Sequence, residues 1–159
     1  MVDQYRIGRA FHTKIHQIND YLFIGSRSAL DDAQLLQSLN IKKVLQLLDF
    51  EIPADDPSIE IHYIHLEDNP DSSIIEILPD CIKYIHDAVM SQTQILVHCN
   101  AGVSRSGAIV TAYIMASQLL SFDKALEYVQ EKRACVDPNE GFTAQLRNCD
   151  PRDLALILL

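Results

Sequence analysis

The chain has 159 residues, 48% hydrophobic and 22% charged, which fits one soluble globular domain with a sizeable core. Its formal net charge of −9 argues against a surface that holds nucleic acid or anionic lipid over a wide area, so a phosphate ligand would need a small local site. The apolar stretches are too short to span a bilayer, and residues 1–4 show neither a signal-peptide pattern nor a glycine at position 2 for myristoylation.

The spacing of apolar residues predicts strands that alternate with helices. In the first half of the chain we expect a hairpin (15–18 and 21–24), a helix that begins near Ser28 and extends to 39, and a buried strand (44–48). A solvated acidic loop (49–58), a strand (61–66) and a polar segment (67–73) follow. In the second half we expect a helix (78–89), a strand (95–98), a helix buried on every side (108–120), and two further helices capped by Ser121 and Asn139. This order favours an α/β fold with a mixed, largely parallel central sheet flanked by helices.

We expect a single domain over 1–159, with its core at about 15–148 and a short apolar tail at 150–159. The tail is expected to end in a strand or helix packed on the domain, with docking of a partner as the alternative. Four cysteines without C-x-x-C spacing favour reduced thiols and a cytoplasmic or nuclear location; they are Cys81, Cys99, Cys135 and Cys149. Cys81 and Cys135 are expected to be simple buried thiols rather than redox partners of Cys99. The histidines His62, His65 and His86 lack metal-ligand spacing, so we expect no metal and no cofactor.

Residues 98–106, His-Cys-Asn-Ala-Gly-Val-Ser-Arg-Ser, are the most informative segment, between a predicted strand and a predicted helix. A thiol attacks phosphorus as a thiolate, and three features favour the thiolate of Cys99. These are the positive end of the helix dipole, a nest of backbone N–H groups over residues 100–105 with Gly102 permitting its curvature, and the charge of Arg105.

The same groups are suited to bind a phosphate dianion, because its oxygens need several donors and a guanidinium binds two oxygens at once. The expected phosphate-binding residues are Asn100, Ala101, Gly102, Val103, Ser104 and Arg105. Ser106 is expected to donate a hydrogen bond to the leaving sulfur, and His98 to order the loop. The alternative is a buried structural cysteine with Arg105 merely at a helix start, but the strand, loop and helix flanks all agree with phosphate chemistry.

This segment resembles the signature loop of cysteine-dependent protein phosphatases, in the dual-specificity branch with its AG-x-SRS form. Residues 112–115 are similar to the A-Y-L-M segment of that family, residues 21–26 to its N-terminal strand, and residues 133–142 with Gln145 and Leu146 to its R-P-x-x-x-P-N-x-G-F segment. Ala134 stands where the family usually has proline. The likeness covers about 15–146, and the chain most resembles the small, atypical members.

Both steps of such a reaction need a proton donor or acceptor, which one carboxyl group can supply. The resemblance implies Asp68 in this role, with Asp71 and Glu67 as alternatives in the same polar segment. It also implies that Arg133 holds a second phosphate or acidic group, against the alternative of a solvated charge, and that Asn139 helps to order the loop.

The resemblance implies a protein phosphatase that acts on phosphotyrosine and on phosphoserine or phosphothreonine through a cysteinyl-phosphate intermediate. The expected partner is a phosphorylated protein, with the MAP kinase pathway as one candidate, and not nucleic acid or membrane; the chain is expected to be a monomer or weak homodimer. Alternatives are a non-catalytic phosphoprotein-binding module, a phosphatase of phosphoinositides or RNA 5′ ends, and a rhodanese-like sulfur transferase. The neutral side chains of Asn100, Ala101 and Val103 argue against the lipid and RNA substrates.

Overall fold

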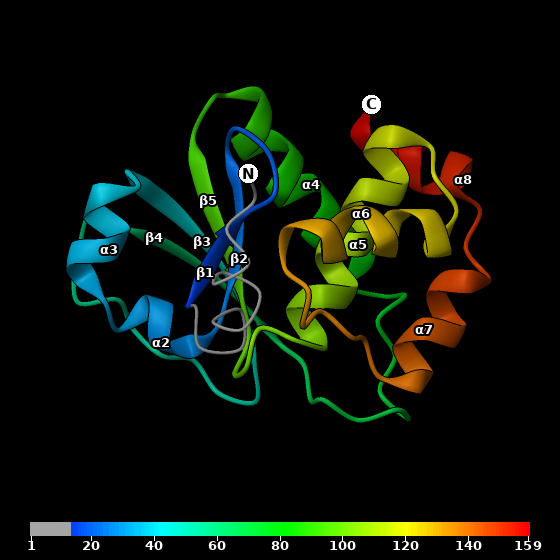
Figure 1. Cartoon of the computed structure of the whole chain (residues 1–159), viewed down its shortest axis with the longest axis horizontal. Coiled ribbons are helices and arrows are strands. Elements are labelled where there is room, and N and C mark those ends of the chain that lie inside the picture. Colours follow the sequence, from blue (N-terminus) through cyan, green and yellow to red (C-terminus); the bar gives the residue numbers. More distant parts are fainter. Residues whose placement is uncertain (1–13) are drawn as a thin grey trace.

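The computed structural model describes residues 14–159, and in this part of the chain five strands form one sheet in the order β1-β2-β5-β3-β4 (Figure 1). The strands are β1 (Ile15–Gln17), β2 (Leu22–Gly25), β3 (Ile41–Leu48), β4 (Glu60–His65) and β5 (Gln94–His98). The expectations about residues 1–4 fall outside the described residues, and the single-domain organisation of the whole chain stays a prediction.

The sheet is mixed and largely parallel, as predicted. β1 pairs antiparallel with β2, and the amide oxygen of Asn19 accepts the N–H groups of Tyr21 and Leu22 in the turn between them. The pairs β2–β5, β5–β3 and β3–β4 are all parallel. Four carboxyl ends therefore meet at one edge of the sheet, which is where open α/β sheets bind their ligands.

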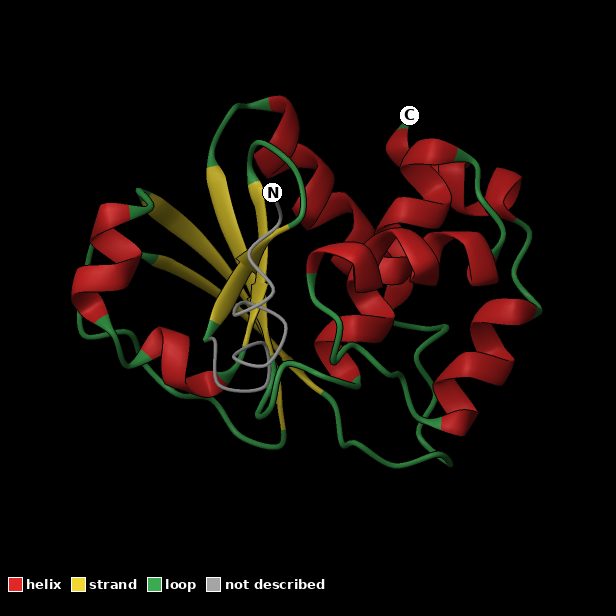
Figure 2. Cartoon of the chain, in the orientation of Figure 1, coloured by secondary structure: helices red, strands yellow, loops and turns green. Residues whose placement is uncertain are grey.

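Helices cover both faces of the sheet (Figures 1 and 2). On one face lie the short helices α2 (Arg27–Leu30) and α3 (Ala33–Ser38). On the other lie α4 (Leu78–Met90), α5 (Arg105–Gln118), α6 (Phe122–Lys132), α7 (Glu140–Arg147) and α8 (Pro151–Ala155), followed by the 3₁₀ turn η1 (Leu156–Leu158). Each face has its own apolar cluster, because successive strand residues point to opposite sides: Leu22 and Ile24 face the larger cluster, and Phe23 the smaller.

α5 is the central helix of the larger layer. Residues 105–116 are all buried, which confirms the predicted enclosure for most of the helix. The last turn differs from the prediction: the helix ends at Gln118, and residues 117–119 are exposed. The helix begins at Arg105, three residues before the predicted start, because the loop from Cys99 leads directly into its first turn. Its positive N-terminal end therefore faces that loop.

The helix predicted near Ser28 differs from the structure. The segment forms two short helices, since the Asp32 carboxylate accepts the N–H of Leu35 and so starts α3 anew. The predicted caps Ser121 and Asn139 are confirmed at α6 and α7.

The apolar C-terminal tail packs on the domain as helix α8 and the turn η1. Leu154 is buried in the larger cluster, and Ile157 and Leu158 pack against it half-buried. Among residues 14–159, no helix combines the length and the apolarity needed to cross a membrane.

Candidate active site

The carboxyl ends of the four parallel strands bring together residues that are far apart in sequence. Arg27 follows β2, Asp49 follows β3, Asp68 follows β4, and Cys99 follows β5. Because β5 lies between β2 and β3, the loop after it is flanked by the segments after its neighbours. The topology thus brings a thiol, two carboxylates and one guanidinium group to one edge of the sheet.

The Cys99 loop connects β5 to α5 and holds a buried thiol. Cys99 is 2% exposed, and its Sγ lies 3.1 Å from the hydroxyl Oγ of the fully buried Ser106. Gly102 has φ +70°, and a Cβ there would lie 2.6 Å from the carbonyl oxygen of Gly25. Glycine is therefore required at this position by both the backbone angle and the space available.

A buried polar network holds the loop from below. Gln46 and His98 are paired across β3 and β5, and the amide Nε2 of Gln46 lies 3.1 Å from Nε2 of His98. The amide donates this hydrogen bond, so the proton of the neutral imidazole sits on Nδ1, which donates to the carbonyl oxygen of Cys99 at 3.0 Å. Burial lowers the pKa of His98, with smaller opposing and reinforcing effects of nearby groups. His98 therefore orders the loop as a neutral side chain, in agreement with its predicted role.

Arg105 is 8% exposed and reaches across to the segments after β3 and β4. Its Nη1 donates to the Asp49 carboxylate at 2.7 Å and to the carbonyl oxygen of Leu66 at 3.0 Å. Its Nε is buried and has no hydrogen-bond partner among the described residues. A buried donor without a partner is costly, and a phosphate oxygen would satisfy it.

Asp68 is the carboxylate of the polar segment that the structure links to the loop. Its Oδ1 accepts a hydrogen bond from Nδ2 of Asn139 at 3.0 Å. The other two candidates show no such link among the described residues: the Glu67 carboxylate lies 4.0 Å from the His65 ring, and Asp71 makes its contact through its backbone N–H, which donates to the side chain of Asn69. The geometry supports Asp68 over both alternatives.

Asn139 connects three parts of the site. Besides donating to Asp68, it caps α7 through Oδ1, which accepts the N–H of Phe142 at 2.9 Å. Its own backbone N–H donates to the Ser104 hydroxyl in the Cys99 loop at 2.9 Å. Asn139 thus links the Asp68 carboxylate to the Cys99 loop.

Arg133 supports the loop from behind, which corrects its expected role as a direct ligand of a second phosphate. It is 2% exposed, and its guanidinium donates to the carbonyl oxygens of Gly102 and Ala101 and to Nδ1 of His16. Burial lowers its pKa, against the favourable effect of nearby thiol groups. With these donors committed, Arg133 fixes the curvature of the loop and does not face incoming substrate.

The remaining cysteines are free thiols. Burial raises the pKa of Cys81 well above its ordinary range, so this thiol is inert at neutral pH. Residues 14–159 contain no cluster of three or more His, Cys, Asp or Glu side chains that could hold a metal ion.

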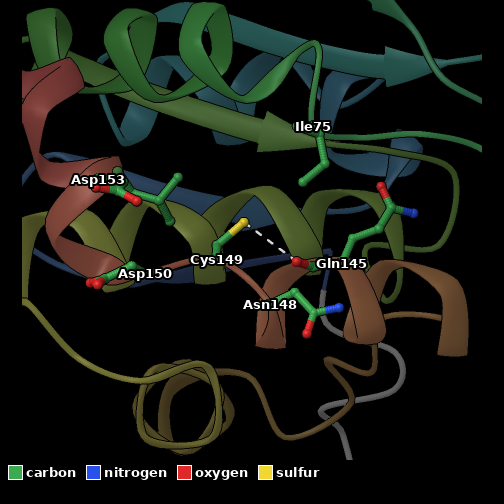
Figure 3. Close-up of a pocket in the computed structure, with 7 residues that line it drawn as sticks. Ile75, Gln145, Asn148, Cys149, Asp150 and Asp153 are labelled. Carbon is green, nitrogen blue, oxygen red and sulfur yellow. Dashed lines mark hydrogen bonds between the residues drawn. The ribbon is translucent and has the colours of Figure 1, made fainter.

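A cavity of about 420 Å³ lies away from the Cys99 loop (Figure 3). Figure 3 shows Ile75 across from Gln145 and Cys149, whose Sγ donates to the carbonyl oxygen of Gln145. The side chain of Gln145 also holds the end of the polar segment 67–73 in place. Its Oε1 accepts the N–H of Ile74, and its Nε2 donates to the carbonyl oxygen of Ser72. Through Gln145 and Ile75, this cavity borders the chain just after the segment that carries Asp68.

Sequence reasoning missed two residues that position the loop. Gln46 is the one polar residue in the apolar run 44–48, a signal that could have marked it. Asp49 was expected to belong to a solvated acidic loop, yet it binds Arg105 because the parallel sheet places the end of β3 beside the loop. The sequence around Asp49 gave no sign of this contact with Arg105.

Comparisons with known proteins agree with this geometry. The family model described as dual specificity phosphatase, catalytic domain, matches residues 22–151. The chain is similar to mouse dual specificity protein phosphatase 19, with 35% identity over 130 residues that cover 82% of this chain and 59% of the mouse protein. It is also similar to dual specificity protein phosphatase 1B of Arabidopsis thaliana, with 32% identity over 154 residues and 92% of each chain covered.

A solved structure shares the fold and more than a quarter of the sequence. The crystal structure of human tyrosine phosphatase-like serine/threonine/tyrosine-interacting protein matches with a TM-score of 0.81 and 31% identity, over 92% of this chain and 99% of that one. The chain spans less than two thirds of several curated relatives: 59% of the mouse protein, and 18% and 35% of two others, from Arabidopsis thaliana and Drosophila melanogaster.

Proposed function

Because this chain belongs to the dual specificity phosphatase family, as the loop resemblance predicted, we propose that it dephosphorylates phosphotyrosine and phosphoserine or phosphothreonine in proteins. The observation that carries the proposal is the contact at 3.1 Å between the Cys99 Sγ and the Ser106 hydroxyl. It is joined by the buried Nε of Arg105, which has no hydrogen-bond partner among the described residues and can bind a phosphate oxygen. This is the arrangement that a thiolate nucleophile and a phosphate dianion need together.

In the first step the Cys99 thiolate attacks phosphorus, forming an S–P bond as the P–O bond to the protein side chain breaks. The departing oxygen takes a proton from Asp68, while Arg105 and the N–H groups of residues 100–105 hold the phosphoryl oxygens. In the second step water attacks phosphorus and gives its proton to the Asp68 carboxylate. The S–P bond breaks, and the Ser106 hydroxyl donates a hydrogen bond to the regenerated thiolate.

The direct test is phosphate release from a phosphotyrosine peptide and a phosphothreonine peptide, with reductant present. We expect turnover by the wild-type chain on both peptides and loss to background for Cys99→Ser, which keeps the shape of the loop and lacks the nucleophile. Wild-type release no faster than that of Cys99→Ser would overturn the proposal.

A second candidate, a module that binds phosphoproteins without turnover, is favoured by one observation. The human relative described above is named as tyrosine phosphatase-like and as an interacting protein. The same experiment separates the two functions: a binder would retain phosphopeptide without releasing phosphate in either form. The intact Cys99, Arg105, Ser106 and Asp68 set supports catalysis.

Protein substrates, rather than lipid or RNA esters, are supported by the neutral loop residues and the net charge of −9. We also propose phosphorylated MAP kinase pathway members as candidate substrates, a cytoplasmic or nuclear location and a monomer or weak dimer. The location is supported by the free thiols. Capture of substrates from a lysate with Cys99→Ser or Asp68→Ala, followed by mass spectrometry, tests the substrate class.

A further inference from the structure

A cavity of about 200 Å³ opens beside the Cys99 loop, at the ends of β2 and β3. Two residues of the loop line it, Asn100 and Arg105; the other lining residues are Arg27, Leu48, Asp49 and Phe50. A group that enters this cavity therefore lies next to the groups that would hold the substrate phosphate. The cavity continues the active site to one side.

Arg27 is fixed to the catalytic loop by its backbone. Its N–H donates to the carbonyl oxygen of Asn100 at 2.9 Å, so the first residue of α2 is tied to the second residue of the loop. Its guanidinium carbon lies 5.7 Å from the centre of the Phe50 ring, a cation–π contact that steadies the side chain. Within residues 14–159, the guanidinium makes no hydrogen bond or ion pair, so its donors remain available.

The charges in the cavity leave Arg27 uncompensated. The one carboxylate in the lining, that of Asp49, is paired with Arg105 at 2.7 Å. The charge of Arg27 also reaches the loop, where it adds to the dominant effect of burial in lowering the pKa of His98. In a chain with a net charge of −9, this is a small positive site beside the nucleophile.

A phosphoprotein substrate often carries further anionic groups next to the phosphorylated residue, and a guanidinium binds carboxylate and phosphate with two parallel hydrogen bonds. Arg133, expected from the sequence to bind such a group, is buried and committed to the loop carbonyls. Arg27 has the exposure and the free donors that Arg133 lacks.

We propose that Arg27, steadied by Phe50 and joined by Asn100, forms a second anion subsite that binds a carboxylate or phosphate on a residue neighbouring the phosphorylated one. The inference rests on the proposed function, since it names the kind of protein substrate that the site prefers. Phe50, 58% exposed, forms the apolar wall against which the intervening peptide lies.

The test compares Arg27→Ala with Lys132→Ala, a matched control. Lys132 is an exposed cation on α6 that lies 5.8 Å from the Tyr128 ring and lines no cavity near the loop, so both changes remove one cation–π charge. The substrates are three phosphotyrosine peptides of equal length, with neutral neighbours, with a neighbouring glutamate and with a neighbouring phosphothreonine. The wild-type chain should have a lower KM for the two anionic peptides than for the neutral one. A comparison of KM between the glutamate peptide and the phosphothreonine peptide then shows whether the subsite prefers a carboxylate or a phosphate.

For Arg27→Ala we expect the preference in KM for anionic over neutral peptide to fall about tenfold with little change in kcat, the loss of one charge-assisted contact. Arg27→Lys should restore part of it, and Lys132→Ala should keep the wild-type preference. An equal rise in KM on all three peptides, or an equal loss in Lys132→Ala, would overturn the subsite.

The same contrast measured as peptide binding in the Cys99→Ser background separates this inference from the proposed function. If the wild-type chain releases no phosphate, the proposed function fails, yet the Kd preference with and without Arg27 still decides the subsite. Kd values that ignore both the neighbouring anion and Arg27 would contradict it.

Discussion

At the scale of single residues, the site depends on which carboxylate faces the loop. Asp68 and Asp71 are both exposed acids in one polar segment, but only Asp68 contacts a residue that is itself bonded to the Cys99 loop, as far as the described residues show. The proposed reaction uses one acid for both steps, and the hydrogen bond from Asn139 favours Asp68 for this role. The preference for Asp68 over Asp71 can be tested, because both are exposed carboxylates of the same segment and Asp71 therefore serves as a matched control.

We expect Asp68→Asn to slow turnover roughly 100-fold or more on substrates with poor leaving groups, since general acid catalysis contributes about 10²–10⁴-fold. On activated aryl phosphates, whose leaving groups need little protonation, the loss should be much smaller. The measurement is kcat for phosphotyrosine peptide against p-nitrophenyl phosphate. Asp71→Asn is the matched control and should behave as wild type on both. Equal losses on the two substrates for Asp68→Asn would show a structural role instead.

At the scale of elements, α7 links stability to chemistry through its first turn. Asn139 caps the helix with its amide oxygen and holds Asp68 with its amide nitrogen. Two substitutions separate these functions. Asn139→Ala removes both, whereas Asn139→Ser keeps an oxygen that can cap the helix and removes the donor to Asp68.

Asn139→Ala should lower the free energy of unfolding by about 1 kcal/mol, and Asn139→Ser by about half of that or less. Both should lower kcat severalfold on poor leaving groups, and shift the dependence on leaving group toward that of Asp68→Asn. Urea unfolding and a series of aryl phosphates of different leaving-group pKa provide the two readouts. If the leaving-group dependence stays at the wild-type value in both variants, Asn139 does not position the acid.

Periodicity and capping were sufficient to predict most of the elements, including the buried part of α5 and the caps Ser121 and Asn139, but not the division of the first helix into α2 and α3. The loop motif was sufficient to predict Ser106 as a neighbour of the thiol, and its hydroxyl lies 3.1 Å from the Cys99 Sγ. Contacts between distant segments depended on the order of strands in the sheet, which local patterns do not specify. Gln46 bonds to His98 across 52 positions because β3 lies beside β5, and Asp49 meets Arg105 for the same reason. Arg133 was misjudged because its burial depends on how the segment after α6 folds behind the loop.

At the scale of the whole molecule, the four parallel strands collect the chemistry at one edge, and the helical layer behind them must hold α5 in place. α5 is enclosed by its neighbours, and Arg105 and Ser106 form its first turn. The C-terminal α8 and η1 belong to this enclosure, because Leu154 is 7% exposed within the larger apolar cluster. The tail is therefore part of the support of the site rather than an appendage.

This arrangement predicts how two leucines of the tail will differ. Leu154→Ala should lower the free energy of unfolding by about 2–4 kcal/mol, since it leaves a cavity in the core. Leu156→Ala is the control: its side chain is 63% exposed, and its loss should change stability by less than about 0.5 kcal/mol. Urea titrations followed by circular dichroism measure both. If Leu154→Ala were as stable as Leu156→Ala, the tail would not be packed, and docking of a partner, the alternative expected from its apolar sequence, would become the better explanation.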